Sequence, residues 1–176
     1  MNLKVMYCPF PTDNVLIGAA ERIVRAHNSK HTLDQFRNKI VKSGAKSLSD
    51  VMSVQQLYII AHGAAGSDSI YSDTGTAMSV TALAKQLKTE GLTASIHKVK
   101  LYCCEGGSNG TNSTAALLKN ALRTEGFNSV STYGYTLCLT QGALTDDGHK
   151  MAVEADSSGK AIMSTATGAK SVRQKF

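Results

Sequence analysis

Two side chains with the chemistry of a catalytic pair follow two short apolar stretches of the chain. His62 follows the apolar residues 57–61, and Cys104 follows the apolar stretch 99–103. A cysteine attacks a carbonyl carbon as its thiolate, and a neighbouring imidazole is the usual group that activates it and protonates the leaving amine. The two residues therefore predict nucleophilic chemistry, provided that the fold brings them together.

Both stretches have the character of buried parallel strands, because each is short, rich in β-branched or aromatic residues, and followed by glycine. Ligands of an open α/β sheet bind at the carboxyl ends of its strands, so His62 and Cys104 are expected in one crevice. Gly63 has no Cβ and can bring its backbone N–H close to a substrate. We expect the amides of Gly63 and Cys104 to form an oxyanion hole.

The four cysteines show no even spacing and no C-x-x-C pair, which favours free thiols. Cys103 is expected to end its strand against a packed layer, whereas Cys104 lies at the more exposed exit. Because a reactive thiol must be accessible, the sequence favours Cys104 as the nucleophile. A zinc site of His62, Cys103 and Cys104 is disfavoured, because adjacent strand residues point to opposite faces. Cys8 and Cys138 are expected to be packing residues.

Strands and helices alternate along the chain. Strands are expected at 3–7, at the two stretches above and at 129–136. Helices are expected after a cap at Thr12 or Asp13, from about Thr32, after Ser79, and after Asn112 or Ser113. This alternation predicts one α/β domain over residues 1–176, a three-layer sandwich with a mainly parallel central sheet.

Three further segments complete the prediction. Residues 150–155 and 160–165 alternate around a Ser-Gly turn and predict a C-terminal β-hairpin. Residues 63–75 are small or polar, so we expect a substrate-binding loop without helix or strand. After Gly168 the end of the chain is expected to be frayed.

Composition narrows the classes of partner. The net charge is +6 and the pI is about 9.2. This favours contact with a polyanion over a specific nucleic acid, because the basic residues form no dense block; a merely solvated basic surface is the alternative. No stretch reaches the roughly 20 apolar residues of a membrane helix. Without a secretory signal, we expect synthesis in the cytoplasm and any export by another route.

The motif around Cys104 resembles that of the caspase-like (clan CD) cysteine peptidases. The run 102–108, Tyr-Cys-Cys-Glu-Gly-Gly-Ser, is similar to the caspase Gln-Ala-Cys-Arg-Gly motif and closer still to the legumain-type Glu-Ala-Cys-Glu-Ser-Gly-Ser run. The size, basic charge and terminal hairpin resemble the autoprocessing cysteine protease domains of bacterial toxins. Inositol hexakisphosphate activates those domains inside host cells.

The resemblance implies a caspase-hemoglobinase-like fold and an endopeptidase of protein substrates, with Cys104 and His62 as its catalytic dyad. It implies no required cofactor, inositol hexakisphosphate as an activator, and a role as an effector or toxin in a host cytosol. Glu105 stands where caspases have arginine, so it would bind a basic or asparagine side chain before the scissile bond, unless it is simply solvated. A hydrophobic pocket for leucine, as in the toxin domains, is the other specificity.

Two other functions fit the same residues. A cysteine–histidine dyad such as Cys104 and His62 would also suit an acyltransferase or a deamidase that modifies a side chain of another protein. A non-catalytic module of the same fold could instead use its basic face to hold an anionic partner. Motifs of P-loop nucleotide hydrolases, serine hydrolases and zinc peptidases are absent from the sequence.

Overall fold

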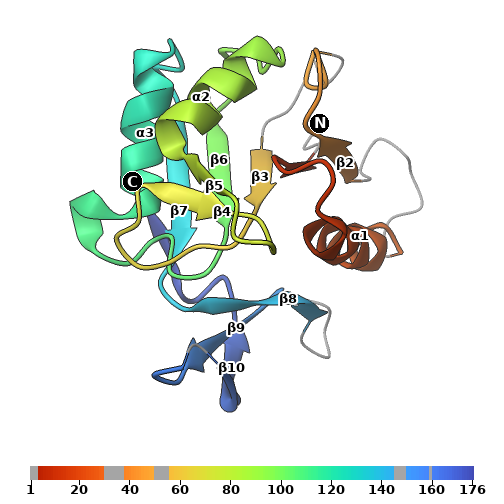
Figure 1. The fold of residues 1–176 in the computed structure, drawn as a ribbon, viewed down its shortest axis with the longest axis vertical. Helices are drawn as coiled ribbons and strands as arrows, with labels where there is room; N and C mark the ends of the chain where they lie inside the picture. The colour runs from red at the N-terminus through yellow and green to blue at the C-terminus, as the bar shows by residue number, and fades with distance from the viewer. Residues whose placement is uncertain (1–3, 30–37, 50–55, 145–149, 159) are drawn as a thin grey trace.

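A six-stranded sheet forms the centre of the computed structural model, which describes residues 4–29, 38–49, 56–144, 150–158 and 160–176 (Figure 1). The strand order is β11-β7-β6-β3-β1-β2. All neighbouring strands are parallel except β11, which runs antiparallel to β7 at one edge. The strands of this sheet are β1 (Lys4–Cys8), β2 (Lys39–Lys42), β3 (Gln56–Ile60), β6 (Lys98–Tyr102), β7 (Ser131–Tyr135) and β11 (Arg173–Lys175).

Helices cover both faces of this sheet. Helix α1 (Asn14–Asn28) connects β1 to β2, whereas α2 (Val80–Thr89) and α3 (Thr114–Thr124) connect β3 to β6 and β6 to β7 in the opposite direction. Because such crossovers are right-handed, reversing the direction moves the helix to the other face. Figure 1 shows α1 on one side, with α2 and α3 together on the other. The predicted three-layer α/β architecture is confirmed.

Each helix begins at a side chain that accepts hydrogen bonds from its first turn. Asp13 accepts from the N–H groups of Val15 and Leu16, at 3.1 and 3.0 Å. Ser79 caps α2 and Ser113 caps α3 in the same way. Because these caps satisfy orphan N–H groups, they fix where each helix starts. A 3-10 helix, Gly110–Asn112, directly precedes the cap of α3.

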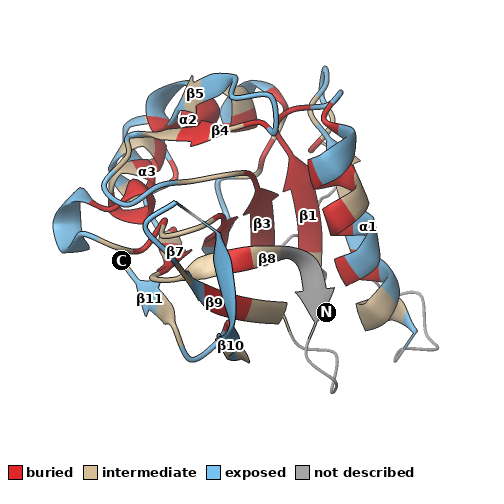
Figure 2. Cartoon of the chain, turned by 60° about the horizontal axis from the view of Figure 1, so that its bottom comes forward, coloured by how far each residue is buried: buried red, intermediate tan, exposed pale blue. Residues whose placement is uncertain are grey.

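A three-stranded antiparallel sheet, which we call the flap sheet, comprises β8 (Cys138–Leu144), β9 (Lys150–Ala155) and β10 (Ala161–Gly168). The predicted C-terminal hairpin corresponds to β9 and β10, and β8 extends it by one strand. In Figure 2, β8 runs in front of the central sheet toward α1, which it contacts. No helix in the described ranges is long and apolar enough to span a membrane.

Three sequence expectations were wrong. The later part of the helix expected from about Thr32 is instead strand β2, in which Ile40 pairs with Met6 of β1; the earlier part of that helix falls in residues 30–37, outside the described part. The expected loop at 63–75 contributes β4 (Ser69–Tyr71), which pairs with β5 (Ala77–Ser79). The end of the chain, expected to be frayed, forms β11 against β7. Strands β2 and β11 depend on partner strands that are distant in sequence, and β4 lies in a polar stretch. Local patterns therefore did not indicate these three elements.

Candidate active site

His62 and Cys104 leave the sheet side by side. Strands β3 and β6 are parallel neighbours, and Ile60 pairs with Tyr102. His62 and Cys104 each follow these paired residues by two positions, so the register delivers both to the same edge. This edge lies at the carboxyl ends of the strands, where an open α/β sheet binds its ligands.

The backbones at the two strand exits are in close contact. A Cβ atom on Gly63 would lie 2.7 Å from the carbonyl oxygen of Cys104 and 2.8 Å from the Sγ atom of Cys103. Such approaches are far inside van der Waals contact, so only glycine fits at position 63 without movement of its neighbours. Gly63 therefore allows the chain after His62 to lie directly against the chain at Cys104.

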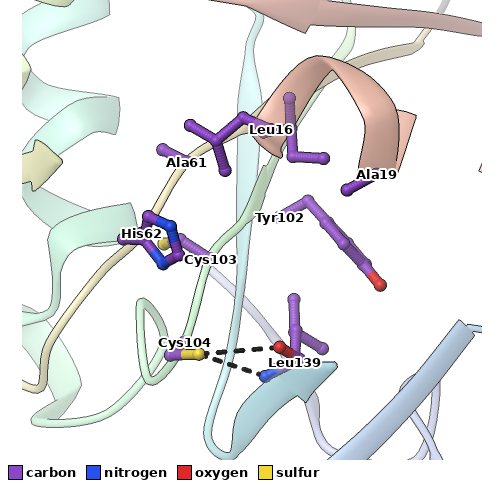
Figure 3. Close-up of a pocket in the computed structure, with 9 residues that line it drawn as sticks. Leu16, Ala19, Ala61, His62, Tyr102, Cys103, Cys104 and Leu139 are labelled. Atoms are coloured by element: carbon purple, nitrogen blue, oxygen red, sulfur yellow. Dashed lines mark hydrogen bonds between the residues drawn. The ribbon is translucent and has the colours of Figure 1, made fainter. Parts of the chain in front are cut away.

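His62 and Cys104 line one small pocket that is partly open to solvent (Figure 3). The other lining side chains are mainly apolar and come from α1, β3, β6 and β8. They are Leu16, Ala19, Ile60, Ala61, Tyr102, Cys103 and Leu139. Glu105 is not among them, so the pocket offers apolar surface rather than a carboxylate to a bound side chain.

The Cys104 thiol is half-buried and contacts the flap sheet. Its sulfur accepts a hydrogen bond from the Leu139 N–H at 3.3 Å and lies 3.8 Å from the Leu139 carbonyl oxygen, to which it donates (Figure 3). Cys138 is adjacent, and its pKa is raised to about 12, mainly by burial and further by its interactions with Cys104 and Glu105. Cys138 is therefore a neutral thiol beside Cys104 at physiological pH.

Cys103 faces the interior. Its side chain is 1% exposed, and burial raises its pKa to about 12. A Cβ on Gly106 would lie 2.7 Å from its sulfur, so the turn after β6 closes directly over this thiol. Both cysteines line the pocket, but Cys103 is almost fully buried whereas Cys104 is partly exposed, so Cys104 is the more accessible thiol.

The two backbone amides expected to form the oxyanion hole belong to Gly63 and Cys104. Within the described part of the chain, neither the Gly63 N–H nor the Cys104 N–H donates a hydrogen bond to the protein.

Glu105 occupies the turn that follows Cys104. Its φ is +50°, and its N–H donates to the Leu137 carbonyl at 3.2 Å. Its expected contact with substrate stays a prediction.

Asp73 is a site residue that the local sequence patterns did not indicate. Its Oδ1 lies 3.4 Å from Nε2 of His62, with side-chain exposures of 43% and 31%. Asp73 belongs to the polar stretch that was expected to be a loop, and nothing in its local sequence marks it. Only the pairing of His62 with Tyr71, which lies two residues before Asp73, brings Asp73 to the site.

Among described residues, no group of three potential ligands could hold a metal ion.

A second cluster, the basic face, lies on the side of the sheet opposite α3. Thr132 of β7 bonds to α3 and pairs with Val99, so Lys98 and Lys100 point the other way. Lys100 lies 4.7 Å from the Tyr58 ring centroid, and Lys150 of the flap sheet lies 3.4 Å from it. The basic face comprises Lys4, Lys98, Lys100, Lys150 and Arg173.

Burial is the main reason that the pKa of Lys100 falls to about 8 and that of Lys150 falls well below its ordinary value. The surrounding positive charges lower both pKa values further. No acidic side chain within the described ranges forms an ion pair with this cluster.

Comparison with known proteins finds similarity in structure. No protein-family model matches the sequence, and no curated protein matches it. A secreted C11 cysteine protease from Bacteroides thetaiotaomicron, solved with an irreversible peptide inhibitor, is similar in structure, with a TM-score of 0.50 and 9% identity over 81% of this chain. A second structure of a secreted C11 cysteine protease from that organism has a TM-score of 0.48 and 10% identity over 81% of this chain.

The chain spans about half the length of these proteases, 51% and 54%. The similarity to the C11 protease supports the predicted caspase-like fold and does not extend to sequence.

Proposed function

We propose that the protein is a cysteine peptidase in which Cys104 is the nucleophile and His62 the general acid and base. The observation that carries the proposal is the contact between the two strand exits, where Gly63 lies against Cys104 and both His62 and Cys104 line one pocket. A cysteine protease of similar fold supports it.

The reaction divides into two steps. The Cys104 thiolate attacks the carbonyl carbon of the scissile bond, and the amides of Gly63 and Cys104 stabilise the oxyanion. The C–N bond then breaks, and the proton held by His62 passes to the leaving amine. Water, activated by His62, hydrolyses the thioester and restores the thiol.

The substrate residue before the scissile bond is proposed to be a medium-sized apolar one, such as leucine. The pocket beside Cys104 is lined by Leu16, Ile60, Tyr102 and Leu139, whereas Glu105 is absent from its wall. Burial of a leucine side chain contributes about 1.5–3 kcal/mol, and an arginine or aspartate would lose its hydration there without a partner. Peptides with leucine, asparagine, arginine or aspartate at this position distinguish the two specificities.

A peptide library and an activity-based thiol probe test the peptidase. We expect Cys104→Ala to abolish both cleavage and labelling, while Cys103→Ala, the matched change one residue away, retains them. The reverse result would assign the nucleophile to Cys103. Loss in both variants would be interpreted only if circular dichroism and thermal unfolding show both to be folded.

Mass spectrometry of a treated protein mixture separates the peptidase from the other uses of the dyad. New N-termini indicate proteolysis, whereas an acylated side chain or the small mass gain of deamidation, without new termini, indicates a transferase or deamidase. No covalent product with any substrate, together with retained anion binding, would favour the non-catalytic module.

We further propose that a polyanion such as inositol hexakisphosphate binds the basic face and regulates the peptidase. Five cations gather there without an acidic partner among the described residues, and two of them have lowered pKa values, so a bound phosphate would relieve unfavourable charge. Lys150 belongs to the flap sheet, whose β8 contacts Cys104. The flap sheet thereby joins the basic face to the nucleophile.

Thermal unfolding at low salt tests the polyanion. At a ligand concentration 100-fold above Kd, binding would stabilise the fold by about 2.7 kcal/mol and raise Tm by roughly 5–10 °C. Lys150→Gln should reduce this shift, whereas Lys85→Gln, the same charge change at an exposed site on α2, should not. Equal shifts in both variants, or none in the wild type, would exclude the basic face as the binding site.

A further inference from the structure

We infer that Asp73 is a positioning residue of the active site, whose carboxylate orients the His62 ring and stabilises its protonated form. The inference rests on the proposed peptidase function. It starts from the approach of Asp73 Oδ1 to His62 Nε2 at 3.4 Å.

The backbone holds the two residues in a fixed relation. The His62 N–H donates to the Tyr71 carbonyl at 2.8 Å, and the Tyr71 N–H donates to the His62 carbonyl at 3.0 Å. This pair of hydrogen bonds clamps β4 against the exit of β3. Asp73 follows Tyr71 by two residues, so its place beside the imidazole results from strand pairing rather than from a freely moving loop.

Asp73 is also anchored from the other side. Its N–H donates to Oδ2 of Asp13 at 2.7 Å, and Oδ1 of the same carboxylate caps α1. Asp13 is only 9% exposed, so this anchor is buried. One buried carboxylate therefore ties the turn that carries Asp73 to the helix that lines the pocket.

The turn itself is closed by its own hydrogen bonds. The Ser72 N–H donates to the Thr76 carbonyl at 3.0 Å, and the Thr76 N–H donates to the Ser72 hydroxyl at 2.9 Å. Gly75 has a φ of +82°, which suits glycine. These contacts fix the backbone of Asp73 and leave its carboxylate to face His62.

The chemical consequence concerns the proton. A carboxylate at Nε2 favours the neutral tautomer that carries its proton there, so the proton exchanged with thiol and leaving amine is held at Nδ1. When the ring accepts that proton, the carboxylate stabilises the positive charge. The same division of labour orients the histidine in other acyl-transfer enzymes.

Because both side chains are partly exposed, solvent screens the pair and the effect is moderate. For Asp73→Asn we expect about a five-fold loss of kcat with little change in KM. The asparagine keeps the backbone N–H that bonds to Asp13, so the anchor survives. Asp68→Asn, the same change at an exposed aspartate outside the pocket lining, is expected to alter neither quantity.

A second readout does not need catalysis. Nitrogen NMR of the His62 ring, assigned with His62→Gln, should show the proton of the neutral ring on Nε2 in the wild type and a mixture of the two tautomers in Asp73→Asn. An unchanged tautomer population would overturn the inference, as would a loss of kcat accompanied by a lowered Tm, which indicates a structural role. A changed tautomer population in a protein without peptidase activity would refute the proposed function and leave the Asp73–His62 pairing intact.

Discussion

Replacing Lys100 by methionine should stabilise the protein at neutral pH, and the gain should disappear as the pH rises. Lys100 is 6% exposed, and its ammonium group bonds to Gln56 at 2.8 Å and to the Tyr58 hydroxyl at 3.0 Å. Burial, together with the positive charges of Arg173, Lys4 and Lys98, lowers its pKa to about 8. Methionine has a similar length without the charge.

The magnitude follows from proton linkage. Below pH 8 the group is protonated in both the folded and the unfolded chain, so folding must place a charge in a poorly hydrated site. Between pH 8 and the ordinary pKa of 10.5, the folded chain has lost this proton and the unfolded chain has not. The free energy of unfolding of the wild type therefore gains about 1.4 kcal/mol per pH unit from this group. Between pH 7 and 9.5 the advantage of the variant should shrink by about 2 kcal/mol.

Urea unfolding of both proteins at several pH values measures this change. The hydrogen bonds lost with the amine, and the titration of cysteines and tyrosines, contribute nearly equally at each comparison and cancel in the pH dependence. Lys98→Met, at the exposed lysine two residues earlier on the same face, is the matched control and should show a much flatter difference. A stability difference for Lys100→Met that stays constant, or that grows with pH, would refute the reasoning.

Two further predictions concern thiols and backbone packing. At pH 8, iodoacetamide should alkylate Cys104 far faster than the other three cysteines, whose pKa values are about 12; peptide mass spectrometry measures the rates, and equal labelling of the folded chain contradicts the assignment. Gly134→Ala should destabilise the fold by roughly 2 kcal/mol or more, because its Cβ would lie 2.5 Å from the Gly107 nitrogen, whereas Gly168→Ala meets open space. Similar urea midpoints for the two alanine variants would contradict it.

Local sequence signals determined most of the scaffold. The capping residues Asp13, Ser79 and Ser113 begin the helices as predicted, because a cap depends only on the next few N–H groups. The largely apolar stretches before His62 and Cys104 form the central strands β3 and β6, since strands covered on both faces are rich in apolar residues. These local patterns placed both side chains at the carboxyl ends of strands.

The tertiary structure decided which residues meet there. Strand β2 replaced an expected helix because Ile40 and its neighbours pair with β1, and β11 formed because β7 offers an open edge. Asp73 reaches His62 only through the pairing of β4 with the exit of β3. Likewise, the strand order and the flap sheet bring Lys100 and Lys150 onto one face.

The difference has one physical reason. Caps, turns and apolar periodicity act over a few neighbouring residues, so the sequence by itself determined the helix starts and the strands that carry Cys104 and His62. Strand order, register and the contacts of loops depend on residues far apart in the chain, whose association is set by packing and pairing free energies of the whole domain. The neighbours of the two candidate catalytic residues, Asp73 and Leu139, were therefore decided by the tertiary structure alone.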